Sequence, residues 1–332
     1  MRIAIDAMGG DNAPVETVKG AVEALKEISA TMVLIGNEEA LKNELSKYSY
    51  DESRIEIIAT TEVVENEDKP VIAIKRKKDS SMVVGFDKVR KGEIDALISA
   101  GNTGALLAGG LLRVGRIKGV DRPALTTVFP TFSGMFVMAD VGANAECKAR
   151  NLLEFGIMGS IYAQDVLGIE NPKVGLINIG TEEGKGTPMI SEAYQLLKES
   201  DLNFIGNVEA RDIPERKADV LVCDGFTGNV VLKLTEGVAK SFMGELKSIF
   251  LSNTLTKVAA GLVKGKLKGL KTKMDYTEYG GAPLLGVKAP IVKAHGSSNA
   301  KAFKNAIKYA EKYVSNNIIE KISSQIKVEE VE

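Results

Sequence analysis

Short apolar runs alternate with longer amphipathic stretches along most of this chain. Runs with the length and the β-branched content of buried strands lie at 2–6, 31–35, 54–59, 94–99, 124–129, 135–139, 174–179, 203–205, 219–223 and 290–294. Apolar residues recur at helical spacing in 14–25, 38–47, 70–78, 80–91, 104–114, 148–166, 188–197, 230–251 and 299–322. Because strands that alternate with helices are typical of βαβ units, the pattern predicts an α/β fold with a mostly parallel sheet flanked by helices.

The loops after six of these strands are rich in glycine, asparagine, aspartate and hydroxyl residues. They lie at 6–11, 99–104, 140–144, 180–187, 224–229 and 295–299. Ligands of parallel α/β sheets gather at the carboxyl ends of strands, so we expect the six loops to line one polar, anion-tolerant cleft. Glycine and asparagine also make ordinary strand-to-helix turns, and for a single loop that interpretation is the stronger one.

The loop at 180–187 sits between an apolar run and a helix that opens with Pro188. Gly184 and Gly186 allow backbone amides to approach an anion, and Lys185 between them supplies a positive charge. The loop is not a Walker A motif, because its glycine spacing is one residue short. The sequence leaves two interpretations open: a phosphate-binding loop, or an ordinary turn with an exposed lysine.

The amino-acid composition indicates a globular protein and gives no support for a nucleic-acid-binding or membrane-spanning protein. Of the 332 residues, 44% are hydrophobic and 26% are charged, which is typical of a globular protein. A net charge of -1 gives no global electrostatic case for binding nucleic acid. Met1 leads directly into a predicted strand, and no apolar run reaches the length of a membrane span. We therefore expect a cytoplasmic protein that meets a membrane only from its surface.

The chemistry-bearing residues argue against several enzyme classes. His295 is the one histidine, the cysteines Cys147 and Cys223 lie far apart, and no Gly-x-Ser-x-Gly motif occurs. We expect no metal and no cofactor. What remains is catalysis by positioning and electrostatics, in which His295 acts as an acid, a base or a hydrogen-bond donor. The alternative is a structural histidine before a glycine turn.

A basic stretch at 255–274 contains six lysines and no acidic residue. At helical spacing its apolar residues fall on one side and most lysines on the other. The residues that we expect to meet a membrane are Leu255, Val258, Leu262, Val263, Lys264, Leu267, Lys268 and Leu270. Two interpretations stay open, and both can hold together: adsorption to an anionic membrane surface, or a helical arm packed on a second copy of the chain.

Eight motifs in order along the chain resemble those of the PlsX phosphate acyltransferase family. They are DAMGGD at 6–11, SAGNTGA at 99–105, GRIKG at 115–119, DVGAN at 140–144, GNVEARD at 206–212, DGFTGN at 224–229, YGGA at 279–282 and KAHGSS at 293–298. One departure is Asn12, where family members often have histidine. Another is Gly184, where a second lysine can occur, whereas Lys185 matches the family's more constant position.

The resemblance implies a fold like that of the isocitrate and isopropylmalate dehydrogenases, divided into two subdomains. The first comprises 1–123 and 290–332, and the second comprises 124–289 with a protruding helical arm at 230–275. It also implies a homodimer that attaches peripherally to membranes. The implied reaction converts acyl-acyl carrier protein and inorganic phosphate to acyl phosphate for phospholipid synthesis, with handover to a glycerol-3-phosphate acyltransferase.

For this reaction we assign Lys185 and His295 to catalysis, with Lys185 on phosphate or the oxyanion. The residues that we expect to bind phosphate or substrate are Asp6, Gly9, Gly10, Asn102, Thr103, Asn144, Gly184, Gly186, Asp224, Asn229 and Ser297. Two other functions stay open: a non-catalytic scaffold that brings an acyltransferase to membranes, and a dehydrogenase on the same fold.

Overall fold

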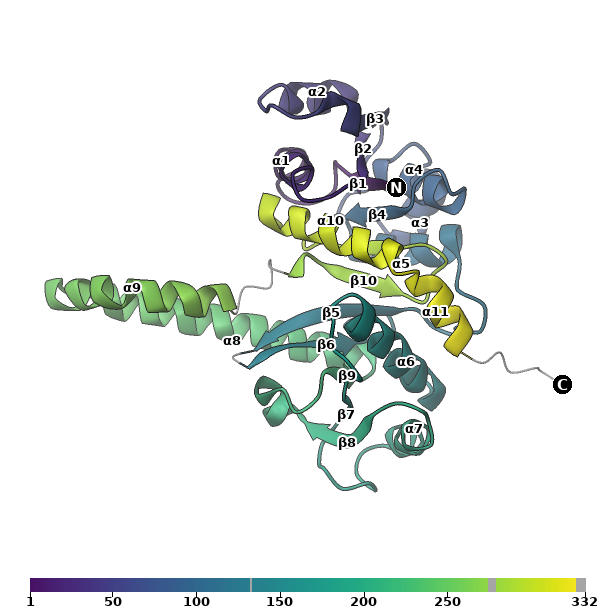
Figure 1. Ribbon diagram of the computed structural model, residues 1–332, viewed down its shortest axis with the longest axis vertical. Coiled ribbons are helices and arrows are strands. Elements are labelled where there is room, and N and C mark those ends of the chain that lie inside the picture. Colours follow the sequence, from purple (N-terminus) through teal and green to yellow (C-terminus); the bar gives the residue numbers. More distant parts are fainter. Residues whose placement is uncertain (132, 274–278, 327–332) are drawn as a thin grey trace.

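The computed structural model describes residues 1–131, 133–273 and 279–326, with the backbone alone at 267, 268 and 270–273. One sheet of eleven strands runs through this part of the chain (Figure 1). Its strands are β1 (Arg2–Asp6), β2 (Thr31–Gly36), β3 (Ile55–Ala59), β4 (Ala96–Ser99), β5 (Ala124–Thr131), β6 (Gly134–Ala139), β7 (Val174–Asn178), β8 (Phe204–Glu209), β9 (Val220–Val222), β10 (Ala282–Leu285) and β11 (Ile291–Lys293).

The strand order is β3-β2-β1-β4-β11-β10-β5-β6-β9-β7-β8. The pairings from β3 to β11 and those from β6 to β8 are parallel. Between these two sets, three pairings are antiparallel: β11 with β10, β10 with β5, and β5 with β6. Three reversals in succession leave the two sets running in opposite directions, so their carboxyl ends point to opposite edges of the sheet.

Helices cover both faces of the sheet, as the alternation of strands and helices predicts. They are α1 (Val15–Ala24), α2 (Glu38–Leu45), α3 (Pro70–Arg76), α4 (Ser81–Arg90), α5 (Thr103–Gly109), α6 (Ala149–Asp165), α7 (Pro188–Lys198), α8 (Gly225–Leu251), α9 (Thr254–Lys273), α10 (Ala300–Ser315) and α11 (Ile318–Gln325). Helices α1 and α10 share one core with β1, β2 and β4, and α4 and α5 pack on the other face. The predicted α/β fold is confirmed.

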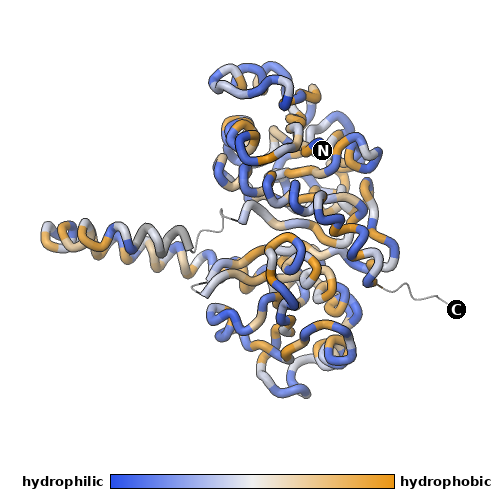
Figure 2. The backbone as a smooth tube through the Cα atoms, in the orientation of Figure 1, coloured by the Kyte–Doolittle hydropathy of each residue, from blue (hydrophilic) through white to orange (hydrophobic). Residues whose placement is uncertain are grey.

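Helices α8 and α9 form a hairpin that projects far from the sheet (Figure 1). Apolar and polar residues are mixed along both helices of this arm (Figure 2). No helix of the described residues is long and apolar enough to cross a membrane. Three residues of the expected membrane surface, Leu267, Lys268 and Leu270, have side chains outside the described part of the chain.

The structure corrects several element boundaries. The helix expected at 299–322 is two helices, because Asn317 adopts a left-handed conformation with φ of 51° and ends the first. Helix α8 begins at Gly225, five residues earlier than expected, where Asp224 caps it. The expected helix at 104–114 continues α5 into a π turn, η2 (Gly110–Val114). Strand β10 is not apparent in the sequence pattern.

The division into 1–123 with 290–332 and 124–289 stays a prediction. Helix α11 crosses from the first of these segments to the second, where Ile318 and Ile322 enter the same core as Phe155 of α6. The sheet itself is continuous across the division through β10 and β5.

Candidate active site

Asp6 lies at the carboxyl end of β1 and is buried. Its Oδ1 accepts a hydrogen bond of 2.6 Å from Ser81 Oγ, and its Oδ2 accepts one of 2.6 Å from Ser99 Oγ. Burial raises the pKa of Asp6 above its ordinary value, while the two serine hydroxyls and the charge of Lys293 oppose that rise. The carboxylate thus joins β1, α4 and β4 and is not open to a ligand.

Glycine lets the loop after β1 approach its neighbours very closely. A Cβ at Gly9 would lie 2.6 Å from Asp6 Oδ2 and 2.8 Å from the backbone nitrogen of Gly101. Gly10 has φ of +104°, and a Cβ there would lie 3.1 Å from the carbonyl oxygen of Gly296. These contacts bring the loops after β1, β4 and β11 together. Gly9 and Gly10 are therefore needed because a side chain at either position would push these loops apart.

Lys293 is the last residue of β11, and only 9% of it is exposed. Its Nζ donates a hydrogen bond of 3.2 Å to the carbonyl oxygen of Ala100 and a second one to that of Ala294. Both carbonyls directly follow strand ends, so the ammonium group lies at the carboxyl edge of β4 and β11. Burial lowers the pKa of Lys293 to about 8, against the charges of Asp6 and Asp11.

His295 follows two residues later in a half-exposed position. Its Nδ1 lies 2.8 Å from Ser297 Oγ and accepts a hydrogen bond of 3.2 Å from the backbone N–H of Ser297. Because that N–H can only donate, Nδ1 holds a lone pair and the ring hydrogen sits on Nε2. Burial lowers the pKa of His295, so the imidazole is neutral at pH 7.

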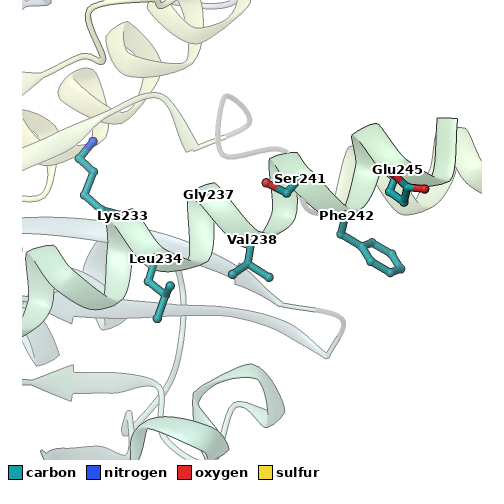
Figure 3. A pocket seen from close by; sticks show the side chains of 7 residues that line it. All are labelled: Lys233, Leu234, Gly237, Val238, Ser241, Phe242 and Glu245. Carbon is teal, nitrogen blue, oxygen red and sulfur yellow. The ribbon is translucent and has the colours of Figure 1, made fainter. Parts of the chain in front are cut away.

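Helix α8 brings two charged side chains to the same edge. Lys233 and Glu236 form an ion pair of 3.2 Å, and the charges of both act on His295. The charge of Lys233 also acts on Lys293. Figure 3 shows Lys233 turned away from the apolar side chains Leu234 and Val238 of the same helix. The edge formed by β1, β4 and β11 therefore faces a lysine from the other half of the sheet.

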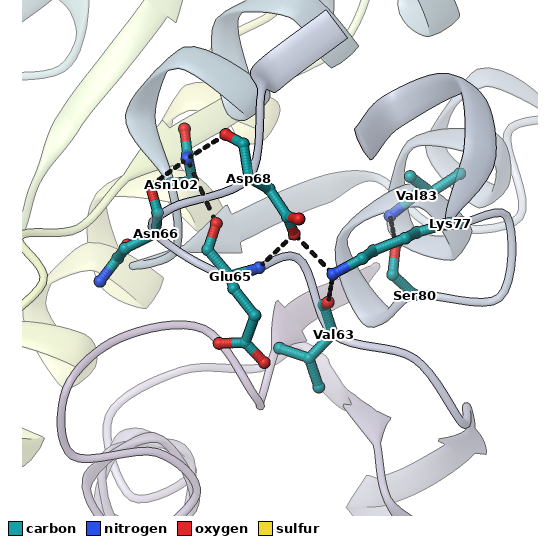
Figure 4. Close-up of polar contacts among 8 residues, drawn as sticks. All are labelled: Val63, Glu65, Asn66, Asp68, Lys77, Ser80, Val83 and Asn102. Atoms are coloured by element: carbon teal, nitrogen blue, oxygen red, sulfur yellow. Dashed lines mark hydrogen bonds and ion pairs between the residues drawn. The ribbon is translucent and has the colours of Figure 1, made fainter. Parts of the chain in front are cut away.

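Asn102 caps α5, since its Oδ1 accepts a hydrogen bond of 2.9 Å from the backbone N–H of Ala105. Its Nδ2 donates to the carbonyl oxygens of Glu65, Asn66 and Asp68, at 3.0 to 3.4 Å (Figure 4). The amide that we expected to contact substrate thus holds a neighbouring loop. Thr103, the first residue of α5, is exposed at this edge.

The opposite edge is organised around Asp140, a buried residue at the end of β6. Its Oδ1 accepts hydrogen bonds from the backbone N–H groups of Leu125 and Gly142, and its Oδ2 accepts from the N–H and Nδ2 of Asn144. Burial raises the pKa of Asp140 despite these bonds. Asn144 also donates to the carbonyl oxygen of Pro123 at 2.7 Å, so its amide braces this loop.

The start of α8 packs on the same loop. Asp224 accepts hydrogen bonds of 2.8 Å from the N–H and the hydroxyl of Thr227, and this caps the helix. Asn229 is exposed, and its side chain lies beside Gly142. A Cβ at Gly228 would lie 1.9 Å from the carbonyl oxygen of Asp140, so only glycine fits there.

Lys185 lies on the loop after β7, with its side chain 52% exposed and its Nζ 4.0 Å from Glu182 Oε1. Asn178 holds the loop, because its Nδ2 donates to the carbonyl oxygen of Lys185 at 2.9 Å. Gly186 has φ of +94°, whereas the space beside Gly184 is open. The side chain of Lys185 is therefore half open to solvent.

The expectation that the six loops lie on one edge of the sheet is wrong. The structure brings Asp6, Gly9, Gly10, Asn102, Thr103, His295 and Ser297 to one edge, and Asn144, Gly184, Lys185, Gly186 and Asp224 to the other. Strands β11 and β7 are five positions apart in the sheet, or about 24 Å at ordinary strand spacing. Within one copy, Lys185 and His295 thus follow strands at opposite edges of the sheet, and their joint assignment to catalysis stays a prediction.

Sequence reasoning missed three residues of these two edges: Lys233, Lys293 and Asp140. Lys293 and Asp140 each end or directly follow an apolar run, which marks them as residues at strand ends but does not show that they are buried. Among the described residues, no cluster of three or more histidine, cysteine or carboxylate side chains is suited to hold a metal ion.

Solved structures of other proteins share this fold. A phosphotransacetylase from Streptococcus pyogenes aligns over 95% of this chain and 94% of its own, with a TM-score of 0.65 and 18% identity. A 4-hydroxythreonine-4-phosphate dehydrogenase from Salmonella typhimurium aligns over 94% of this chain and 99% of its own, with a TM-score of 0.51 and 14% identity. At such low identities the likeness defines the class of fold alone, one that phosphotransacylases and dehydrogenases share.

Comparison of the amino-acid sequence identifies the family, which the shared fold alone does not. A family model described as a fatty acid synthesis protein matches residues 1–321. A phosphate acyltransferase from Alkaliphilus oremlandii is 62% identical over 326 residues, which cover 98% of this chain and 97% of that protein. The chain belongs to this family and is an acyltransferase. These comparisons favour neither a scaffold without activity nor a dehydrogenase.

Proposed function

We propose that the chain transfers the acyl group of acyl-acyl carrier protein to inorganic phosphate, giving acyl phosphate and free acyl carrier protein. The observation that supports this most is the high identity, over nearly the whole chain, to a protein named phosphate acyltransferase. A phosphate oxygen attacks the thioester carbonyl carbon, the carbon–sulfur bond breaks, and the thiolate of the carrier leaves. Because a thiolate is a good leaving group, the reaction needs positioned charge more than a strong acid.

Within this proposal, the reaction takes place at the carboxyl edge of β1, β4 and β11. This edge carries the imidazole of His295, which Ser297 holds in place and whose lowered pKa keeps it neutral at pH 7. It also faces the ammonium group of Lys233 on α8. The three loops are held in place by Asp6, Gly9, Gly10 and Asn102. Thr103 and Ser297 each present an exposed hydroxyl at this edge.

We assign a separate role to the loop at 180–187. Lys185 is half exposed and lies on the opposite edge, so it meets the reacting phosphate only if a second copy brings it there. Within one copy, its charge is suited to an anionic group of the acyl donor, either the acidic carrier or the phosphate of its prosthetic group. The space beside Gly184 is open to such a contact, whereas Gly186 packs closely against Asn178.

The apolar stripe along α8 supports a homodimer. Val230, Leu234, Val238 and Phe242 recur at spacings of four and are at least half exposed, with Phe242 at 65% (Figure 3). A continuous exposed row of this kind is typical of a surface that another protein covers. The row is long enough for two antiparallel or crossed copies of α8 to bury it against each other.

The basic helix α9 is suited to an anionic membrane. Leu255 is 80% exposed and Leu262 is 85% exposed, and the lysines Lys257, Lys264 and Lys266 are exposed on the same helix. Apolar side chains that enter the lipid interface, together with lysines that meet anionic headgroups, stabilise such contact. Peripheral attachment would place acyl phosphate beside the membrane, where a glycerol-3-phosphate acyltransferase would take it over.

Release of free thiol from acyl-acyl carrier protein tests the proposed reaction. We expect the purified chain to release thiol only when inorganic phosphate is present, with a rate that saturates in phosphate. Thiol release that is equally fast without phosphate would indicate a thioesterase and would contradict the proposal.

A further inference from the structure

Lys293 is a buried cation whose hydrogen bonds are incomplete. Its ammonium group has three protons, and two of them point to the carbonyl oxygens of Ala100 and Ala294. Among the described residues, the third proton has no acceptor within hydrogen-bond distance. The carboxylate of Asp6 does not take this place: among the described contacts it accepts from Ser81 and Ser99, and no hydrogen bond or ion pair joins it to Lys293.

Leaving one of the three protons of a buried ammonium group without an acceptor costs free energy, and an oxygen of a bound anion would supply that acceptor. The position of Lys293 favours such a ligand. Its two carbonyl partners directly follow the ends of β4 and β11, and ligands of parallel α/β sheets bind at the carboxyl ends of strands. Lys233, which is paired with Glu236, adds a second positive charge at the same edge, and the neutral ring of His295 lies beside it. The lysine is also held rigidly, so that little conformational entropy is lost when an anion binds.

We propose that Lys293 is the cation that binds inorganic phosphate, with Lys233 and His295 beside the same anion. This inference rests on the proposed function, but it concerns phosphate binding and not turnover. It places the phosphate at the carboxyl ends of β4 and β11 and not at the loop that contains Lys185.

Binding of inorganic phosphate without acyl donor tests the assignment by isothermal titration calorimetry. Lys293→Met removes the charge and keeps a similar length, and we expect its Kd for phosphate to rise roughly 10- to 100-fold. Lys288→Met is the matched control, because Lys288 is exposed at the other end of β11, and its Kd should match the wild type. A folded Lys293→Met that binds phosphate as the wild type does would reduce Lys293 to a link between two loops and overturn the proposal.

The pH dependence of phosphate binding to the wild type gives a second test that does not depend on a folded variant. The charged groups that act on Lys293 are Asp6, Asp11 and Lys233. Lys293 loses its proton as pH rises through about 8. We expect the Kd for phosphate to rise as pH rises from 7.5 to 9.5. A Kd that stays constant over this range, or a wild type that binds no phosphate, would contradict the proposal.

The two proposals can fail separately. If the wild type binds phosphate through Lys293 but releases no thiol, the site stands and the reaction is wrong. If thiol release depends on phosphate while Lys293→Met leaves both Kd and KM for phosphate unchanged, the reaction stands and the phosphate lies elsewhere.

Discussion

Lys293 Nζ donates a hydrogen bond of 3.2 Å to the carbonyl oxygen of Ala100, a residue 193 positions away in the sequence. The bond joins the ends of β4 and β11, which are adjacent in the sheet. It fixes an ammonium group directly beside the loop that contains His295. The chemistry of this edge therefore depends on a contact between two segments that lie far apart in the sequence.

The burial of Lys293 makes stability depend on pH. Its pKa is lowered to about 8 in the folded protein, whereas the unfolded chain keeps the ordinary value near 10.5. Between these values the unfolded state binds more protons, so the contribution of Lys293 to stability rises with pH. We expect the free energy of unfolding of the wild type, relative to Lys293→Met, to increase by roughly 3 kcal/mol from pH 7 to 10.5. Urea unfolding at several pH values measures this difference, and a difference independent of pH would show that Lys293 is not buried as described.

The hydrogen bond from Ser297 to His295 predicts how the reaction responds to pH. Because the pKa of His295 is lowered and Nε2 carries the hydrogen, the neutral ring acts as a donor. We expect kcat to be constant above pH 6.5 and to fall below it, because a proton on Nδ1 removes the lone pair that accepts from the Ser297 N–H and so releases the ring from its orientation. His295→Ala should lower kcat by roughly 100-fold, whereas His295→Gln, which keeps a donor, should lower it less. A kcat that falls as pH rises from 6 to 8, with the slope of one proton, would instead assign His295 to proton donation.

The exposed stripe on α8 predicts an oligomer that one charge can disrupt. Phe242→Glu places a carboxylate in the middle of the stripe, and burying two such charges in an interface is costly. We expect sedimentation equilibrium to give a dimer for the wild type and a monomer for Phe242→Glu. Lys247→Glu, an exposed substitution on the same helix, is the control and should remain dimeric. A wild type that is monomeric at micromolar concentration would rule out this interface.

The exposed leucines of α9 predict that the protein binds to anionic vesicles. Replacing both Leu255 and Leu262 by serine removes two of its most exposed apolar side chains. We expect this variant to bind phosphatidylglycerol vesicles at least several-fold more weakly than the wild type in a flotation assay. Leu112→Ser removes an exposed leucine away from the arm and should bind as the wild type does. Equal binding of all three proteins would show that α9 does not mediate attachment.

The sequence predicts most elements of this fold, because its buried strands are short apolar runs and its helices have one apolar face. It does not predict the direction of the strands. Strand β10, with the sequence Ala-Pro-Leu-Leu, is too short to distinguish from a loop, yet its two antiparallel pairings help to reverse the second half of the sheet. Loops that look equivalent in the sequence therefore separate to opposite edges.

The candidate site was predictable only in part. His295 stands out as the one histidine, and Lys185 as a charge among glycines. Asn102 and Asn144 have the composition of ligands, but tertiary contacts use their amides to hold neighbouring loops. Lys293 was not apparent, because a lysine at the end of a strand usually reaches solvent. Its burial depends on the carbonyl groups of Ala100 and Ala294, and no local pattern reveals that contact.

The most direct test is to trap acyl phosphate with hydroxylamine during incubation with palmitoyl-acyl carrier protein and phosphate. We predict that the wild type forms the hydroxamate only with phosphate present, and that His295→Ala forms it roughly 100-fold more slowly. Lys185→Ala should raise KM for the acyl donor while its KM for phosphate stays unchanged. If the folded wild type forms no hydroxamate with any acyl chain, the proposed function is wrong. If His295→Ala forms it at the wild-type rate, the reaction does not take place at the edge of β1, β4 and β11.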